Sequence, residues 1–314
     1  MAVVVYLLVL RGIVSVVGFV GNVMLIHTLL KLPRLKTYEL FLLGLAFSNV
    51  EELLIVEIYD IVVFVLPRSQ ISRWVCRTLK FLTILGEIGS IAFTVLISVY
   101  RYQKLRDAQR RANRPILLDS ARAAYALFWA SALFAFLLAV PTYVTNLDGH
   151  LNNLTYNSTS CPPDFFQCPP DNCPLLNALY KYLFVLLCNL LPLLIVTWTS
   201  CLIVRVLIGQ QRAVHSRLAA QAQSHTQSQQ QQQPTFRLRT SKIQQSTVTV
   251  LVAMAVFQVD WTLYLMLHLA FDPYTFSGFN EVEFFITTSY TTISPYVYGL
   301  GNNILSCKTL RCGG

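Results

Sequence analysis

Long apolar blocks, separated by shorter polar segments, recur along this sequence from its first residues to its last. A helix needs about 20 apolar residues to cross a hydrocarbon core about 30 Å thick, and the blocks reach that length. The pattern predicts an all-α membrane protein in which one domain, residues 1–314, forms a bundle of seven transmembrane helices. We expect these helices at about 3–30, 38–66, 77–106, 121–144, 179–208, 243–270 and 281–303.

Composition strengthens this interpretation, because 54% of the 314 residues are hydrophobic and only 12% are charged. Soluble domains carry charge on about a quarter of their residues. The net charge of +9 would suit nucleic acid only if the cations were gathered on a soluble module, and the sequence contains no such module. We therefore expect a multi-pass plasma membrane protein surrounded by lipid, with no nucleic-acid partner.

The distribution of lysine and arginine predicts how the chain crosses the membrane, since short cytoplasmic loops retain these cations. The connectors after the first, third and fifth helices, the helix ends that adjoin them and the tail together hold 18 of the 24 cations. The N-terminus is then outside the cell and the C-terminus inside. Residues 145–178 become an extracellular loop, 209–241 a cytoplasmic glutamine-rich loop and 304–314 a short cytoplasmic tail. Asn153 and Asn157 open Asn-X-Thr sequons in the extracellular loop and are candidate glycosylation sites.

Cysteines fall into groups according to their place in this topology. Those predicted outside are Cys76, Cys161, Cys168 and Cys173. Four cysteines allow two disulfides in three pairings. We expect Cys76 to pair with one of the other three, because a disulfide limits the entropy cost of ordering a long loop, and the remaining two to pair within that loop. Cys307 and Cys312, in the predicted tail, are candidates for palmitoylation.

Acidic residues inside the predicted helices are candidates for function, because a carboxylate at a helix centre costs about 2.5–3.5 kcal/mol on insertion scales. With the helical rise per residue, Glu52, Glu87 and Asp260 lie at one level, roughly 21–26 Å from the cytoplasmic ends of their helices. We interpret Glu87, Asp260 and Trp261 as the floor of a ligand site in the outer half of the bundle. The other residues expected to line it are Glu52, Lys80, Tyr180, Tyr264, His268 and Phe285.

The chemistry of that site leaves alternatives open. The acids could instead be protonated, or paired with hydroxyl groups and Lys80, and simply hold the helices together. As a ligand site, the acids suit an amine, whereas an aromatic acid would need Lys80 or Lys181. We favour a small organic ligand that is cationic or amphoteric.

An arginine, Arg101, stands at the cytoplasmic boundary of the third helix, 25 residues after Cys76. The order of this and other motifs resembles the rhodopsin-type G-protein-coupled receptors over the whole chain except the glutamine-rich loop. The matching positions are Gly21-Asn22, Leu45-Ala46, Trp74-Val-Cys76, Trp129, Pro141, Pro192 and Pro295-Tyr-Val-Tyr298. The resemblance implies a heterotrimeric G protein as partner, no cofactor, and a coupling switch. The switch residues it implies are Tyr100, Arg101, Tyr102, Pro295 and Tyr298.

Departures from that pattern point to a subfamily. This chain has Tyr100 where most such receptors have an acid before the arginine, and Asn49 where they have an aspartate in the second helix. It has Ser294 where they have an asparagine before Pro295, and no proline follows the tryptophan of Phe257–Trp261. With the segments SVYRYQKLRD (98–107) and AFSN (46–49), these departures resemble the fish olfactory receptors related to class A, relatives of the mammalian type-1 vomeronasal receptors. This implies an olfactory or pheromone receptor acting through an inhibitory G protein. Without a neighbouring acid, Arg101 should be held weakly at rest, so ligand-independent signalling is expected.

Other function classes fit less well. A retinal protein needs a lysine in the seventh helix, and residues 281–303 contain none. An ion channel or transporter would use Glu52, Glu87 and Asp260 as a conduction path and would carry current without a G protein. Enzymes find no support, because the sequence has no HExxH and no paired catalytic motif, and we expect no metal site. A peptide or lipid receptor of the same fold stays as the alternative, although the short N-terminus argues mildly against large peptides.

Overall fold

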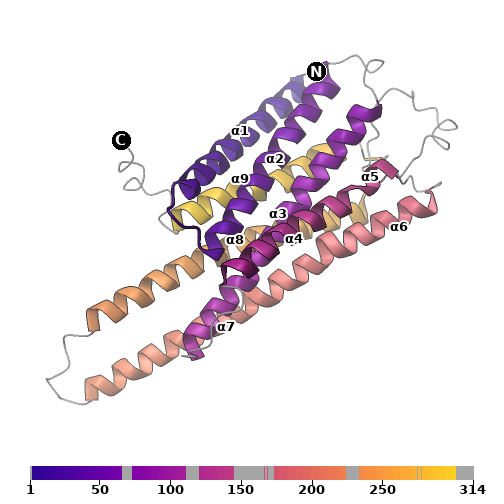
Figure 1. The fold of residues 1–314 in the computed structure, drawn as a ribbon. Coiled ribbons are helices and arrows are strands. Elements are labelled where there is room, and N and C mark those ends of the chain that lie inside the picture. The colour runs from indigo at the N-terminus through magenta and orange to yellow at the C-terminus, as the bar shows by residue number, and fades with distance from the viewer. Residues whose placement is uncertain are drawn as a thin grey trace, which may run out of the picture.

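Seven long helical rods, packed side by side, make up the described part of the chain (Figure 1). The computed structural model describes residues 2–65, 73–110, 120–144, 166, 168, 173–223, 233–273, 275–276 and 278–301. The elements are α1 (Ala2–Leu30), α2 (Thr37–Val65), α3 (Arg73–Arg110), α4 (Ala121–Ala139), α5 (Pro141–Val144), α6 (Leu175–Phe184), the π-helical turn η4 (Val185–Leu190), α7 (Leu191–Gln223), α8 (Gln233–Ala270) and α9 (Phe279–Gly301). α4 and α5 make one rod, and α6, η4 and α7 make another. The predicted all-α seven-helix bundle is confirmed.

Two rods are interrupted at prolines. The fourth, predicted as a continuous helix over 121–144, breaks at Val140 because Pro141 has no N–H to donate to the helical ladder. The fifth begins at Leu175, earlier than the predicted 179, and passes through the π-helical turn just before Pro192. A π turn is a common way for a helix to absorb a local mismatch.

The fifth and sixth rods extend further than their apolar runs. α7 continues to Gln223 and α8 begins at Gln233, so most of the predicted glutamine-rich loop over 209–241 is helical. These two ends run past the neighbouring helices, at the lower left of Figure 1. The reason is that bilayer thickness limits an apolar run but does not end a helix, and glutamine, alanine and arginine are good helix formers.

Five helices of the described residues are long and apolar enough to cross a membrane: Tyr6–Leu30, Trp74–Asp107, Ala121–Tyr143, Leu175–Arg212 and Ser246–Ala270. The other two rods are α2, which carries Glu51, Glu52 and Glu57, and α9, which is rich in threonine, serine and tyrosine. Most of their described side chains are buried or half-buried by other helices, whereas α1, α4 and α7 expose large apolar side chains such as Ile13, Trp129 and Trp198. Helices that face neighbours more than lipid can be more polar.

A buried network of uncharged polar groups joins four rods near their middle. The amide of Asn49 donates to Asn22 Oδ1 at 3.1 Å and to Ser294 Oγ at 3.0 Å, and its Oδ1 accepts from Ser90 Oγ at 2.8 Å. Asn22 in turn donates to the carbonyl oxygen of Thr291 at 2.9 Å. Asn49, where the resemblance leads one to expect an aspartate, therefore serves as a neutral centre that ties α2 to α1, α3 and α9.

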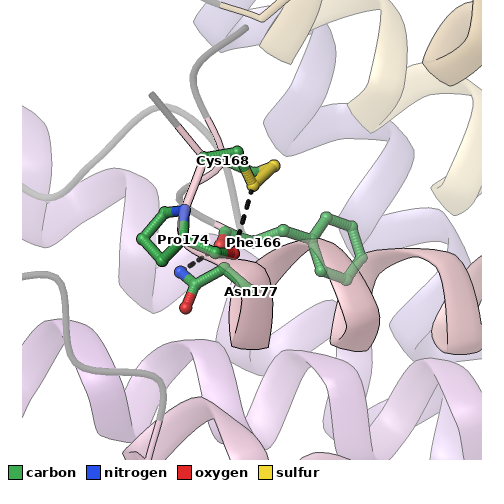
Figure 2. Close-up of a disulfide and its surroundings, with 5 residues drawn as sticks. Phe166, Cys168, Pro174 and Asn177 are labelled. Atoms are coloured by element: carbon green, nitrogen blue, oxygen red, sulfur yellow. Dashed lines mark hydrogen bonds between the residues drawn. A yellow bond between two sulfur atoms is a disulfide. The ribbon is translucent and has the colours of Figure 1, made fainter. Parts of the chain in front are cut away.

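One end of the bundle carries a disulfide between Cys168 and Cys173, and we call it the disulfide end. Next to it the amide of Asn177 donates to the carbonyl oxygen of Phe166 at 2.9 Å (Figure 2). The Phe166 ring is buried against Phe184, with ring centroids 5.2 Å apart. This segment is therefore fastened to the start of the fifth rod. The opposite end, which contains Arg101, is called the arginine end.

Candidate functional site

Four acidic side chains from three helices come together in the half of the bundle nearer the disulfide end. Glu51 and Glu52 are on α2, Glu87 is on α3 and Glu283 is on α9. Glu52 interacts electrostatically with Glu51 and Glu87, and Glu87 with Glu283. Glu52, Glu87 and Glu283 are 3%, 7% and 8% exposed. We call these four residues the acid cluster.

Close approach of α2 and α3 allows the acid cluster to form. Gly86 faces α2, and a Cβ atom there would lie 3.0 Å from the backbone nitrogen of Glu52 and 2.5 Å from Glu51 Oε2. A side chain at this position would fit only if Glu51 moved and the two helices separated. The next residue, Glu87, is thereby brought beside the acids of α2.

Some oxygen atoms of the acid cluster have no hydrogen-bond partner among the described residues. These are Oε1 of Glu51 and Oε1 of Glu87. Buried polar atoms are paired in the great majority of cases, so unpaired ones call for an explanation. The described residues contain no group of three or more histidine, cysteine or acidic side chains placed to hold a metal ion. The arrangement is suited chemically to an organic cation with N–H donors.

Glu283, in the acid cluster, has a basic partner. His268 on α8 lies 3.0 Å from it, measured from Nε2 to Oε1, and both side chains are largely buried. His268 also ends a row of aromatic rings along α8. The centroid distances in this row are Phe257–Trp261 5.9 Å, Trp261–Tyr264 5.1 Å, Tyr264–His268 4.2 Å, and His268–Phe279 5.1 Å to α9. The row connects the acid cluster with the middle of the bundle.

Asp260, expected on the same floor as Glu87, is directed to α9. Ser289 Oγ donates to Asp260 Oδ2 at 2.6 Å. This carboxylate therefore ties α8 to α9. Its level along the helix could be predicted from the sequence, but its direction depends on how α8 and α9 pack.

The remaining predicted site residues are placed as follows. Lys80 is buried on α3, at 4% exposure. Tyr180 donates from its hydroxyl to the carbonyl oxygen of Leu138, at 2.8 Å, which fastens the fifth rod to α4. Phe285 is half-buried, and its ring contact is with Phe284 of its own helix, with centroids 5.3 Å apart.

An ion pair at the disulfide end was not among the predicted site residues. Arg11 Nη1 of α1 lies 3.1 Å from Glu281 Oε2 of α9, and its guanidinium carbon lies 4.0 Å above the Phe284 ring. Arg11 and Glu281 are 270 positions apart, so no local pattern links them. The one signal in the sequence was a basic residue inside an apolar helix.

Three of the predicted switch residues, Tyr100, Arg101 and Tyr298, form one cluster at the arginine end. Tyr100 is fully buried, and Tyr298 interacts electrostatically with Arg101. Pro295 is buried inside α9, one turn before Tyr298. Tyr102 contacts a different cation, Arg106, whose guanidinium carbon lies 5.8 Å from its ring centroid.

Tyr38 is the member of this cluster that the sequence interpretation missed. Its ring on α2 lies 3.6 Å from the guanidinium carbon of Arg101 and stacks on Tyr100, with centroids 6.5 Å apart. The available signal was an aromatic residue in the first turn of the second helix, at the same level as the arginine.

The predicted covalent features fall partly outside the described residues. Cys168 and Cys173 are joined, as expected for two cysteines of one loop, and Cys76 is disulfide-bonded as well. Cys161, another of the three expected partners for Cys76, lies outside the described residues. The others outside them are Asn153, Asn157, Cys307 and Cys312.

Comparison with known proteins adds two findings. Residues 21–298 match the sequence profile of the family described as 7 transmembrane receptor (rhodopsin family). The chain is also similar to a gonadotropin-releasing hormone receptor of Octopus vulgaris, with 23% identity over 303 residues that cover 92% of this chain and 69% of the relative. The matched range of the family includes the acid cluster and Arg101.

Proposed function

Because the chain belongs to the rhodopsin family of seven-transmembrane receptors, we propose that its acid cluster holds the ligand and that Arg101 passes the signal on. Family membership makes this protein a multi-pass plasma membrane receptor that signals through a heterotrimeric G protein, and not an enzyme. We propose that the outward movement of α8 frees Arg101 to contact the G protein. The electrostatic interaction of Arg101 with Tyr298 of α9 supports this role.

We propose that the ligand is a small organic molecule with a cationic group, anchored at Glu87. The observation that carries the proposal is that Glu87 is only 7% exposed, interacts electrostatically with two further acids, and has a carboxylate oxygen without a hydrogen-bond partner among the described residues. An ammonium or guanidinium group would supply both the opposite charge and the missing donor. Trp261, whose Nε1 also lacks a partner there, is the aromatic wall we expect the ligand to contact.

A Glu87→Gln variant should lose at least about tenfold in potency for amines, because an amide removes the charge that a desolvated cation needs. Responses to carboxylate compounds should stay the same or improve. The measurement is a panel of amines and carboxylates applied to cells that express the receptor with a promiscuous G protein. Glu39→Gln is the matched control, because Glu39 is an acid at the far end of α2 that accepts a hydrogen bond from the backbone of Lys36. An unchanged amine response in Glu87→Gln would rule out the cationic ligand.

We further propose that the N-terminus lies outside the cell and the C-terminus inside, with the disulfide end extracellular. Enzymatic removal of N-linked sugars should then shift the receptor on a gel, and the shift should disappear in an Asn153→Gln/Asn157→Gln double variant. A C-terminal tag should become accessible to antibody only after the cells are permeabilised. A tag stained on intact cells would reverse the topology.

The finer proposal is an olfactory or pheromone receptor for a water-borne ligand, coupled to an inhibitory G protein. It is supported by the segments 98–107 and 46–49 and by Tyr100 before the arginine. A fall in cyclic AMP on addition of water-soluble odorants, together with transcripts in olfactory epithelium, is the expected result. A rise in cyclic AMP would contradict the inhibitory coupling.

A hormone receptor, with a peptide as the ligand, is the second candidate, and the likeness to the gonadotropin-releasing hormone receptor favours it. A peptide would contact a wider surface at the disulfide end, so no single acid would supply most of the binding free energy. Peptide responses that survive Glu87→Gln but fail in Cys168→Ser would favour this candidate over the small cation.

A further inference from the structure

The guanidinium of Arg101 rests on an aromatic ring of another helix. Its central carbon lies 3.6 Å from the centroid of the Tyr38 ring on α2, well within the range in which a cation is attracted to the face of a ring. The Tyr38 side chain is 7% exposed, so water competes little for this contact. The contact connects α2 and α3 at the arginine end.

Neighbouring groups keep the Tyr38 ring in place. It stacks on Tyr100, with centroids 6.5 Å apart and ring planes at 19°. Tyr100 is in turn packed by the edge of Phe41 at 6.3 Å, and its hydroxyl accepts a hydrogen bond from Lys104 Nζ at 3.2 Å. Since Tyr38, Phe41 and Tyr100 are all buried, the ring has little room to turn away from the arginine.

The position directly before Arg101 cannot supply an anion, because it is the fully buried tyrosine Tyr100. We propose that Tyr38 is a positioning residue that acts in place of such an anion, because its ring holds Arg101 in the resting arrangement and so limits ligand-independent signalling. The proposal rests on the G-protein signalling of this receptor and on Arg101 as its coupling residue, but not on the identity of the ligand. It revises the expectation that Arg101 is held weakly for want of an acid.

A Tyr38→Leu variant should raise ligand-independent G-protein activation about threefold or more per receptor at the cell surface, because an aliphatic side chain fills the space without attracting the cation. Tyr38→Phe keeps the aromatic ring, so its basal G-protein activation should stay as low as that of the wild type. Phe128→Leu is the matched control, because it removes a ring of α4 that contacts Phe93 and Trp129 instead of Arg101, and it should leave basal activation unchanged. Equal basal activation in Tyr38→Leu and Tyr38→Phe overturns the proposal.

A second series removes the objection that leucine impairs folding. Phenylalanines with increasing numbers of ring fluorine atoms, incorporated at position 38, weaken the attraction for a cation while hardly changing the shape. Basal activation should rise step by step along this series, and the melting temperature of the purified receptor should fall in parallel. If neither basal activation nor the melting temperature changes along the series, the proposal is overturned. A melting trend without a trend in basal activation would keep the ring contact but overturn the proposal that this contact limits signalling, whereas a failed amine response alone would refute only the proposed ligand.

Discussion

Replacing Asn49 with leucine is expected to keep most of the receptor from reaching the cell surface and to lower the melting temperature of the remainder. The variant loses three hydrogen bonds, to Asn22, Ser90 and Ser294, and leaves polar groups buried between helices. Hydrogen bonds between membrane helices contribute on average about 0.6 and at most about 1.7 kcal/mol each, so the loss is roughly 2–5 kcal/mol. That is a large part of the stability of about 5–15 kcal/mol typical of folded proteins.

The graded control for this prediction is Ser294→Ala, which removes one of the three bonds and should cause about a third of the loss. Surface display is measured with an N-terminal tag on intact cells, and stability by thermal unfolding in detergent. If Ser294→Ala proved as damaging as Asn49→Leu, the stabilisation would belong to Ser294 and not to the network centred on Asn49.

A Gly86→Val variant is expected to reach the cell surface as poorly as Asn49→Leu, because the added side chain would clash with α2. Even the first added carbon would lie 3.0 Å from the backbone nitrogen of Glu52 and 2.5 Å from Glu51 Oε2, and a branched side chain adds two more. The oxygen of Glu51 could move, but the backbone of α2 could not without separating the two helices. Overpacking of this kind typically costs about 1–3 kcal/mol and sometimes more.

The matched control is Gly12→Val on α1, because no atom lies within 4 Å of a Cβ atom added there. Both variants change helix propensity in the same way, so the difference between them isolates the packing at Gly86. We expect Gly12→Val to be displayed at the wild-type level. Equal losses in both variants would show that propensity, and not the contact of α2 with α3, causes the defect.

The fold was largely predictable because its signals are local. A run of about 20 apolar residues indicates a membrane helix, and such runs predicted all seven rods, although only five of them are long and apolar enough to cross a membrane among the described residues. The ends were less predictable where a helix leaves the bilayer, as at Gln223 and Gln233, since apolar length and helix length then differ. The break at Pro141 and the π turn before Pro192 were signalled by proline, but their form depends on packing.

The sequence indicated which residues belong to the candidate site and how far along each helix they lie, but not which side chain each of them contacts. Glu52 and Glu87 were placed at one level by the helical rise, and they do interact. Glu87 also interacts electrostatically with Glu283 of α9, however, and Asp260 accepts a hydrogen bond from Ser289 of the same helix. The rotation of each helix about its axis decides these pairings, and single-helix patterns fix that rotation only coarsely in a bundle with polar side chains on several faces.

By itself the sequence determined that the chain is an all-helical membrane protein, that Arg101 follows the apolar run of the third helix, and that acids lie inside the bundle. These conclusions follow from composition, from the length of the apolar runs and from the spacing of residues, all of which can be read along the chain. Only the tertiary structure decided that Arg101 rests on Tyr38, that Asn49 joins four helices and that one oxygen of Glu87 has no hydrogen-bond partner among the described residues. Contacts of this kind join residues tens to hundreds of positions apart, and they exist only once the helices have packed.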